Sequence, residues 1–336
     1  MTLPLNAASV HIDQALTNLT IAYLQDASNF IADRVFPRVS VDKKSNKYYI
    51  YDRANFNRAG QVKKRSAGTQ VNTIGMSLSQ DSYFTEVYGV GVDFEFEMLA
   101  NEDSALNTRS AAAQMLTMQM LIHRESAWAT KYFTNGVWGT EYAGVAGAPI
   151  AGQVKQWSSY VDSTPIVDMT NARRAMQLKS GGFKPNVMVV GKEVRDILVN
   201  HPDILERLNG GSTVTNTALI TDSKLAEIFE VEEFLVMESV QNTAAEGLAE
   251  TNSFIGGKSA ALFYRPRASG LMIPSAGYTF TWDNLQTASG FGVVIESFTG
   301  AFLEIKGIAE HIQVNLAYDQ KIVSSDLGVF FATIVA

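Results

Sequence analysis

The chain has 336 residues, of which 46% are hydrophobic and 18% charged, so it can bury a sizeable core, about two domains are expected, and wholesale disorder is excluded. Its 27 Lys and Arg residues against 34 Asp and Glu residues give a net charge of -7, which argues against a strongly basic binder of duplex DNA. Because there is no cysteine, disulfide frameworks, zinc–thiolate sites, iron–sulfur clusters and thiol nucleophiles are also excluded.

The sequence predicts neither a metal site nor a membrane segment. The histidines stand singly, without the spacing of a ligand pair: His11, His123, His201 and His311. The first basic residue is Arg34, so no secretory leader is expected. The best apolar run, residues 111–122, is 12 residues long and is interrupted by polar side chains, which is too short to span a bilayer. We therefore expect a soluble protein that is made where it is used.

The first elements along the chain have little to bury by themselves. Residues 1–37 show little periodicity apart from a short helix expected over Asn18–Leu24, and we interpret them as an arm that lies over something else. Two strands are predicted at residues 47–52 and 81–90, both rich in aromatic and β-branched residues. The polar stretch between them has almost no apolar content, so we expect a projecting hairpin that docks on a neighbour.

Charge is concentrated around this hairpin. The segment from Arg34 to Arg65 holds ten basic and two acidic residues, whereas Ser66 to Thr108 holds seven acidic residues and no basic one. Two interpretations stay open: both segments are solvated faces, or the basic segment docks on an acidic ridge of another copy of the chain. For docking, the candidate contact residues are Lys63, Lys64, Arg65, Glu95, Glu97, Glu102 and Asp103.

A long helix is predicted next. Residues 92–135 contain neither glycine nor proline, and residues 101–104 supply a cap and N-terminal acids. Apolar positions at helical spacing then continue for about 30 residues, which corresponds to a rod of roughly 45 Å. Their positions are Leu106, Ala113, Leu116, Met120, Ala127 and Trp128.

The rest of the chain alternates helices and strands before it ends in strands. Residues 136–163 are rich in glycine and alanine and are expected to form a boundary loop. Helices are predicted at 165–179, 192–200 and 218–229, with strands at 186–190, 233–238 and 259–264. The last 60 residues predict long antiparallel strands at 278–282, 292–305, 311–323 and 329–335.

No motif predicts an active site. Residues 252–259 approach a phosphate loop, but the first glycine is missing and a strand follows where a helix is needed, so a turn is favoured. Residues 89–91 lack the third glycine of a dinucleotide fingerprint. A pair of catalytic acids is conceivable, although acids on an exposed helix are usually solvated. The candidates for it are Glu193, Asp196, Asp203 and Glu206.

The tyrosines of the predicted hairpin, which are Tyr48, Tyr49 and Tyr51, allow two readings. They could stack on single-stranded nucleic acid, or they could pack against another subunit, which we prefer.

Four stretches, taken in order, resemble the major capsid proteins of tailed bacteriophages, which have the Hong Kong 97-like fold. Phe30-Ile-Ala-Asp-Arg-Val-Phe-Pro37, followed by Lys47-Tyr-Tyr, is similar to the family's N-terminal arm and extended loop. Asn186-Val-Met-Val-Val-Gly191, with Val194, Leu198 and His201-Pro-Asp203, resembles its strand–helix passage. The stretch from Phe229 to Gly247 and the stretch Pro274-Ser-Ala-Gly-Tyr-Thr-Phe-Thr-Trp282 resemble two further family motifs. The resemblance covers about residues 25–336.

The resemblance implies an α+β fold with five parts. These would be an N-terminal arm (1–37), an extended β-hairpin loop (38–92), a peripheral domain with a spine helix (93–150), an axial domain (151–290) and peripheral β-strands (291–336). Only about 30 residues precede the arm-like stretch Phe30–Pro37, so scaffolding is expected to be a separate protein, or the chain is already the mature form.

The resemblance also implies a function. The chain would be a non-enzymatic subunit of an icosahedral viral capsid, without cofactor or metal, that assembles into hexamers and pentamers around a double-stranded DNA genome. Its partners would be other copies of itself, a separate scaffolding protein, a portal and a decoration protein, with only non-specific contact to DNA, in a virion assembled in the host bacterial cytoplasm. Two alternatives stay open: a non-viral shell protein of the encapsulin type that encloses a cargo enzyme, and a hydrolase with carboxylates brought together by the fold.

Overall fold

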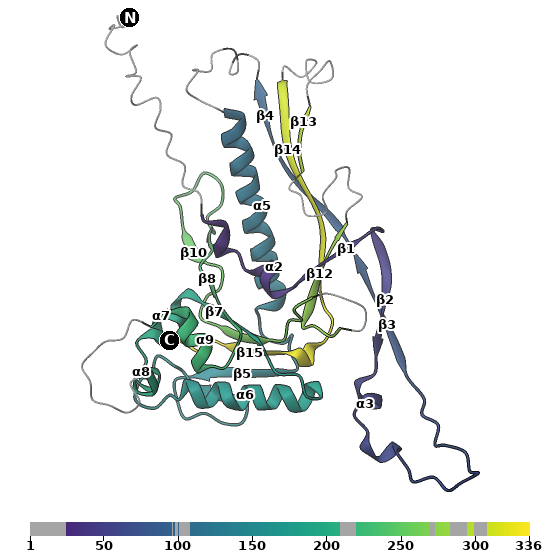
Figure 1. The fold of residues 1–336 in the computed structure, drawn as a ribbon. Helices are drawn as coiled ribbons and strands as arrows, with labels where there is room; N and C mark the ends of the chain where they lie inside the picture. Colours follow the sequence, from purple (N-terminus) through teal and green to yellow (C-terminus); the bar gives the residue numbers. More distant parts are fainter. Residues whose placement is uncertain are drawn as a thin grey trace, which may run out of the picture. The chain divides into compact units, whose positions relative to one another are not determined.

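A computed structural model describes residues 25–95, 97, 100, 108–208, 220–268, 273–282, 294–298 and 308–336. The chain divides into two compact units. The first comprises Met1–Ala27, Val87–Leu121 and Phe291–Leu316, and the second comprises Ser28–Glu86, Ile122–Gly290 and Ala317–Ala336. Within the described ranges no helix has the length and apolar character needed to cross a membrane. The mixture of helices and strands agrees with the expected α+β class (Figure 1).

A six-stranded mixed sheet forms the centre of the second unit. In spatial order its strands are β6 (Gln153–Lys155), β5 (Thr140–Val145), β15 (Gly328–Ala332), β11 (Ala260–Phe263), β7 (Val187–Gly191) and β8 (Glu233–Met237). β11 runs antiparallel to both of its neighbours, and the other pairs are parallel. Every residue of β7 and β11 is buried, as is typical of strands that are covered on both faces.

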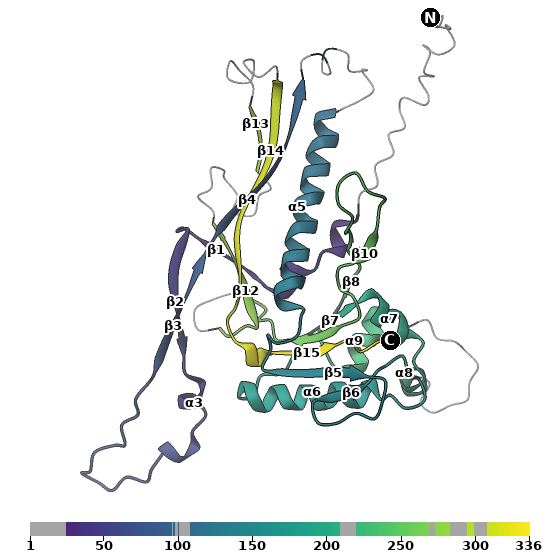
Figure 2. The same ribbon diagram turned by 180° about the vertical axis from the view of Figure 1, so that it is seen from behind.

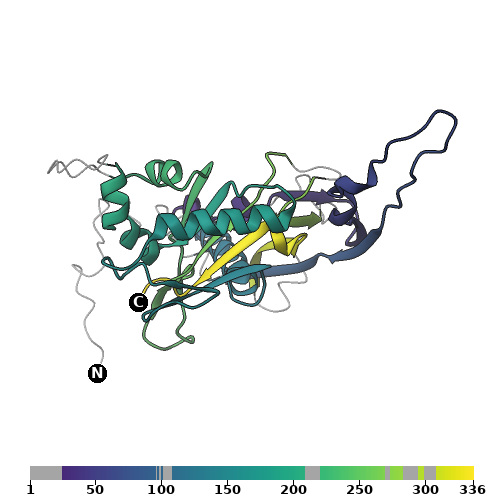
Figure 3. The ribbon, with the colours of Figure 1, turned by 90° about the horizontal axis from the view of Figure 1, so that it is seen from below.

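Four helices accompany this sheet. They are α6 (Pro165–Ser180), α7 (Lys192–Val199), α8 (Pro202–Leu208) and α9 (Asp222–Ile228). α6 packs on β5 and β15 and lies across the sheet in Figure 3. Its buried residues Ile166, Met169, Ala172 and Met176 recur at helical spacing. The helix ends at Gly181, which adopts a left-handed φ of 80° and bonds back to the carbonyl of Gln177.

The core of the second unit includes residues that precede the first strand. Phe36 is fully buried, and its ring lies 5.1–6.5 Å from the rings of Trp128, Tyr132, Trp138 and Phe263. Truncating a buried phenylalanine typically costs about 3–5 kcal/mol of unfolding free energy. The end of the predicted arm is therefore part of the core of its own unit.

The boundary loop predicted at residues 136–163 is wrong. This stretch contains β5 and β6, and both of its tryptophans, Trp138 and Trp157, are buried. β5 pairs with β15 at the far end of the sequence, so local composition could not reveal it. One of the glycines that suggested a loop is needed for close packing: a Cβ at Gly144 would lie 2.3 Å from the carbonyl oxygen of Thr333.

Five strands form a second sheet that contains β14 (Ile308–Ile322), which belongs partly to each unit. The others are β1 (Arg38–Val41), β12 (Gly277–Trp282), β13 (Val294–Phe298) and β4 (Glu86–Glu95). In the second unit, β1 runs parallel to β12, which is antiparallel to β14 with Gly277 opposite Ile322. In the first unit, β13 is antiparallel to β14 with Val294 opposite Asn315, and β4 also pairs with β14.

The glycines at 89 and 91, whose spacing faintly resembles a dinucleotide fingerprint, lie inside β4. A Cβ at Gly89 would lie 2.5 Å from the Oδ1 of Asn315, and one at Gly91 would lie 2.7 Å from the Cε1 of His311. The glycines thus leave room for side chains of β14. Their role is structural.

The predicted hairpin is present. β2 (Ser45–Tyr51) pairs with β3 (Leu78–Phe84), with Ser45 opposite Phe84 and Tyr51 opposite Leu78. We call β2, β3 and the chain between them the ribbon. The single strand predicted at 81–90 is wrong, because it breaks at Thr85, whose backbone N–H and hydroxyl both donate to the carbonyl of Lys44. β3 therefore ends in the ribbon, and β4 begins in the second sheet.

Most other predicted elements are confirmed with small shifts. The long helix is α5 (Thr108–Tyr132), in which Leu116, Met120 and Trp128 are buried. Its predicted cap at 101–104, Leu106 and the helix over Asn18–Leu24 lie outside the described residues. Other described elements were not predicted, among them β1, α8 and the hairpin of β9 (Val240–Asn242) and β10 (Asn252–Phe254). The last predicted strand, β15, belongs to the six-stranded sheet. The proposed domain limits stay a prediction.

Replacing Gly144 by alanine should lower the free energy of unfolding by about 2 kcal/mol or more, because the new methyl group meets backbone atoms that cannot rotate away. Gly147→Ala is the matched control, since a Cβ there has nothing within 4 Å. Chemical denaturation of both variants measures the difference. Equal stabilities would contradict the assignment of this stretch to the sheet.

Candidate functional site: the ribbon and the arm

The base of the ribbon is anchored to its own unit by aromatic stacking. Tyr83 and Phe280 stack with ring centroids 4.6 Å apart, and the ring of Tyr48 lies 5.5 Å from that of Phe280. The Tyr48 hydroxyl donates to Asp81 at 2.8 Å. Burial and this bond to a carboxylate raise the pKa of Tyr48 above its ordinary value, so the hydroxyl stays a donor at neutral pH. The backbone N–H of Phe84 donates to Asp319 at 2.9 Å.

Beyond this base the ribbon buries almost nothing. Figure 2 shows β2 and β3 leading past α3 (Arg53–Phe56) to an extended loop. Val62 is 88% exposed and Met76 is 62% exposed. Other large apolar side chains that are exposed on the ribbon are Tyr49, Tyr51, Phe56, Val71, Ile74, Leu78 and Phe84. So much apolar surface on one thin element is typical of an interaction site.

The basic candidates Lys63, Lys64 and Arg65 lie in this loop. All three are exposed, and none forms an ion pair with any part of the chain that the structure describes. Several other bases of the segment from Arg34 to Arg65 form ion pairs inside the second unit: Arg34 with Glu233, Arg38 with Asp33 and Arg53 with Asp326. Four bases without an ion pair in the described chain, namely Arg58, Lys63, Lys64 and Arg65, therefore lie in the loop.

The acidic candidates are only partly described. Glu95 at the end of β4 and Glu97 just after it are exposed, whereas Glu102 and Asp103 lie outside the described residues. Glu95 and Glu97 belong to the first unit, and the basic loop belongs to the second. Docking of one group on the other stays a prediction.

The end of the arm is fixed by a buried carboxylate on α5. The N–H groups of Ile31 and Ala32, at the start of α2 (Ala32–Val35), donate to the carboxylate of Glu125 at 2.8–3.1 Å. Burial raises the pKa of Glu125 to about 7, although the two N–H donors and Arg124 lower it. Arg124 also pairs with Asp33 of α2 at 2.5 Å.

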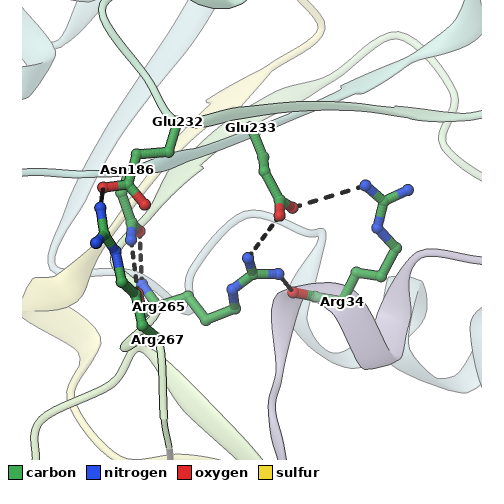
Figure 4. Close-up of polar contacts among 6 residues, drawn as sticks. All are labelled: Arg34, Asn186, Glu232, Glu233, Arg265 and Arg267. Atoms are coloured by element: carbon green, nitrogen blue, oxygen red, sulfur yellow. Dashed lines mark hydrogen bonds and ion pairs between the residues drawn. The ribbon is translucent and has the colours of Figure 1, made fainter.

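A second set of polar contacts fixes the arm to the strand ends of the six-stranded sheet (Figure 4). The guanidinium of Arg265 donates to the backbone carbonyl of Arg34 and pairs with Glu233 at 2.8 Å. The side chain of Arg34 reaches the same carboxylate at 3.7 Å. The side-chain amide of Asn186 donates to the Arg265 carbonyl at 2.6 Å and accepts from the Arg265 N–H at 2.8 Å. Four separate segments therefore meet at Arg265.

A serine–histidine contact in the second unit resembles a catalytic pair, but its hydrogen bonds run in the direction opposite to the one that catalysis needs. Ser163 Oγ lies 2.8 Å from His201 Nε2, and both residues are buried. The backbone N–H of Asp203 donates to His201 Nδ1, so Nε2 carries the proton and donates to Ser163, which in turn donates to the Ser159 carbonyl. Burial lowers the pKa of His201, which keeps the ring neutral. No base accepts the serine proton.

The structure does not bring the candidate acids together as a catalytic pair. Asp196 pairs with Lys192 and Arg195, Glu193 lies 4.0 Å from Lys258, and Glu206 is exposed. No cluster of potential metal ligands occurs among the described residues.

The stretch that approached a phosphate loop is a turn between strands. It joins β10 to β11, and Gly257 packs so closely on Gly191 that a Cβ at Gly191 would lie 1.9 Å from the Gly257 carbonyl oxygen. The turn interpretation is confirmed, because no helix follows to complete a phosphate site.

The chain matches no established protein-family model. It is 27% identical over 328 residues to the major capsid protein of Pseudomonas phage JBD67, covering 97% of each chain. It is 26% identical over 280 residues to the major capsid protein of Burkholderia phage BcepMu, covering 80% of this chain and 82% of the relative.

Several solved structures are similar to this chain in their fold. A phage-related protein from Bordetella bronchiseptica RB50 matches with a TM-score of 0.64 and 17% identity, over 92% of this chain and 94% of its own. The capsid structure of the cyanophage P-SCSP1u matches with a TM-score of 0.57 and 13% identity, over 94% and 90% of the two chains. The SrpI encapsulin from Synechococcus elongatus PCC 7942 matches with a TM-score of 0.50 and 11% identity, over 99% and 96%.

The raised pKa of Glu125 predicts a pH dependence of stability. Since the folded-state pKa of about 7 exceeds the ordinary value of 4.5, the stability from protonating this group is full below about pH 4.5 and is lost as the pH rises to about 7. Glu125→Gln keeps an acceptor oxygen but does not titrate, so the variant should gain stability relative to the natural chain between pH 5 and pH 8. Denaturation at both pH values measures this gain.

Glu125→Ala is the companion variant. It leaves the N–H groups of Ile31 and Ala32 without their acceptor and should cost about 1–3 kcal/mol at either pH. If the glutamine variant followed the natural chain at both pH values, the carboxyl group would not be buried as described.

Proposed function

We propose that this chain, which has the Hong Kong 97-like fold of tailed-phage major capsid proteins, is the structural subunit of an icosahedral viral capsid. In this role it self-assembles into hexamers and pentamers that enclose a double-stranded DNA genome. Similarity to a phage major capsid protein along nearly the whole chain supports the proposal most directly.

The geometry supplies an independent argument. The ribbon is anchored at its base, yet its apolar side chains have no cover within the described part of their own chain. Covering them requires another molecule, and repeated head-to-tail contacts between copies supply such cover throughout a closed shell. Within the structure itself, the observation that carries the proposal is this exposed apolar surface on an anchored element.

An encapsulin-type shell that encloses an enzyme is the alternative with the same fold. The likeness to the Synechococcus encapsulin supports only the fold, whereas the two curated relatives are both phage capsid proteins. The phage function is therefore better supported. Particles isolated from the natural source should contain DNA, and a packaged enzyme in place of DNA would favour the alternative.

We further propose that the chain has no enzymatic activity. The support is the bond direction at Ser163 and His201 and the scattered placement of the candidate acids. Neither arrangement offers a nucleophile with a base to activate it.

The remaining partners are inferred from what a shell needs. A separate scaffolding protein would control curvature, a portal would occupy one vertex, and a decoration protein would bind outer surfaces, with assembly in the host bacterial cytoplasm. The net charge of -7 suits a container wall, because strong affinity for DNA in every subunit would impede packaging.

The basic loop is proposed to dock on the acidic residues of an adjacent copy. Lys63, Lys64 and Arg65 carry positive charge that the described chain leaves without an ion pair, and Glu95 and Glu97 are exposed acids in the other unit. Exposed pairs contribute only about 0–1 kcal/mol each, so they should set register and association rate more than shell stability. Because salt screens charges beyond roughly 8–10 Å, added salt should slow assembly.

Assembly is the first consequence to test. The purified full chain should sediment as pentamers, hexamers or closed shells, because a monomer leaves the ribbon's apolar surface in water. Analytical ultracentrifugation over a range of concentrations measures this. A monodisperse monomer at high concentration, with a protease-resistant ribbon, is the result that would overturn the proposal.

The charge docking has its own test. Replacing Lys63, Lys64 and Arg65 together by Glu should reduce shell formation at low salt while circular dichroism stays unchanged. The matched control reverses three other exposed bases of the second unit, Arg174, Lys184 and Arg207, for the same change in net charge. Normal assembly of the loop variant, or equal loss in both variants, would rule out specific docking.

A further inference from the structure

The ribbon contacts its own unit at a second place, beyond the aromatic base. Arg53, the first residue of α3, pairs with Asp326 of η4 (Ser325–Leu327) at 2.9 Å. Asn57 lies directly over the end of α6, where a Cβ added to Gly181 would come within 2.2 Å of its side-chain nitrogen. Figures 1 and 2 both place α3 beside this end of α6.

The end of α6, where it meets α3, is a favourable place for a basic side chain. The last carbonyl groups of a helix carry partial negative charge, and the side chain of Arg53 passes 3.1 Å from the position that a Gly181 Cβ would occupy. Gly181 thus has two reasons to be glycine, namely its left-handed φ and the close approach of the ribbon. Phe56 in turn contacts Tyr51 at the end of β2, with ring centroids 6.3 Å apart, so α3 is joined to β2 as well.

A second attachment matters because a two-stranded ribbon is a flexible lever. The seven paired residues of β2 span about 23 Å, so a swing of about 10° at the base would move the far end by about 4 Å. Such a displacement is comparable to the spacing of neighbouring strands. Contacts at the base alone would therefore not fix the position of the loop beyond α3.

We propose that the contact of Arg53 and Asn57 with Gly181 and Asp326 is a strut that fixes the direction of the ribbon. The strut presents the apolar and basic loop of residues 58–77 in one orientation before any partner binds. Its consequence for assembly rests on the proposed function, whereas its effect on the ribbon does not. The partner surface then meets a loop that is already positioned, which lowers the ordering cost of association.

The effect on the ribbon is measured directly with spin labels. The chain has no cysteine, so Ser66→Cys in the loop and Asn171→Cys on the exposed face of α6 give a single labelled pair. Under conditions that keep subunits apart, the distance distribution between the labels should be narrow. Arg53→Glu should broaden it, and Arg53→Glu combined with Asp326→Arg should narrow it again.

Assembly supplies the second readout. Arg53→Glu should slow shell formation by about threefold, in line with the loss of one exposed ion pair, and the double variant should recover the rate. Arg58→Glu is the matched control, because Arg58 is an exposed base of the same loop without an ion pair in the described chain. This control should leave the distance distribution unchanged.

The outcomes separate the two proposals. An unchanged distribution in Arg53→Glu, or equal broadening in Arg58→Glu, would overturn the strut. A broadened distribution with an unchanged assembly rate would overturn its role in assembly. If no variant and not even the natural chain forms shells, the proposed function fails, while the label distances still decide the strut.

Discussion

The packing of Tyr83 and Tyr48 against Phe280 is the interaction on which the ribbon depends. It holds one end of the ribbon against Phe280 of the same unit, while the large apolar side chains farther along the ribbon stay exposed. Two isolated strands are marginal in water, so the anchored base has to stabilise their pairing. The same anchoring leaves the ribbon's apolar residues exposed, and this exposure is the physical basis for the proposed assembly.

Unlike the ribbon, the arm is buried in its own unit at its described end. Phe36 lies in the aromatic core, Glu125 accepts the N–H groups of Ile31 and Ala32, and Arg265 holds the carbonyl of Arg34. These contacts make residues 31–36 a part of the second unit, although the sequence suggested an arm lying over something else.

Much of the fold could be predicted because its signals are local. The proline at the start of α6 and the glycines after it delimit that helix, and the aromatic and β-branched residues around Tyr48 predict β2. β5 could not be predicted, since its partner β15 lies near the other end of the chain. Nor did the sequence indicate that Thr85 would divide one strand into two, because this break depends on its bonds to Lys44.

The candidate site was predictable in part for the same reason. Exposure of Lys63, Lys64 and Arg65 follows from a polar stretch with nothing to bury, whereas the pairing of Arg53 with Asp326 joins residues far apart in sequence. The buried contact of Ser163 with His201 has no sequence signal either, because neither residue lies in a recognisable motif.

The most direct test of the central claim is the chemical accessibility of Met76, an exposed apolar residue of the ribbon. Its oxidation rate by dilute peroxide can be measured by mass spectrometry in dissociated subunits and in assembled particles, with the fully buried Met188 as the internal reference. The account predicts rapid oxidation of Met76 in subunits and a rate that approaches that of Met188 after assembly. Equal rates of Met76 oxidation in both forms would contradict it.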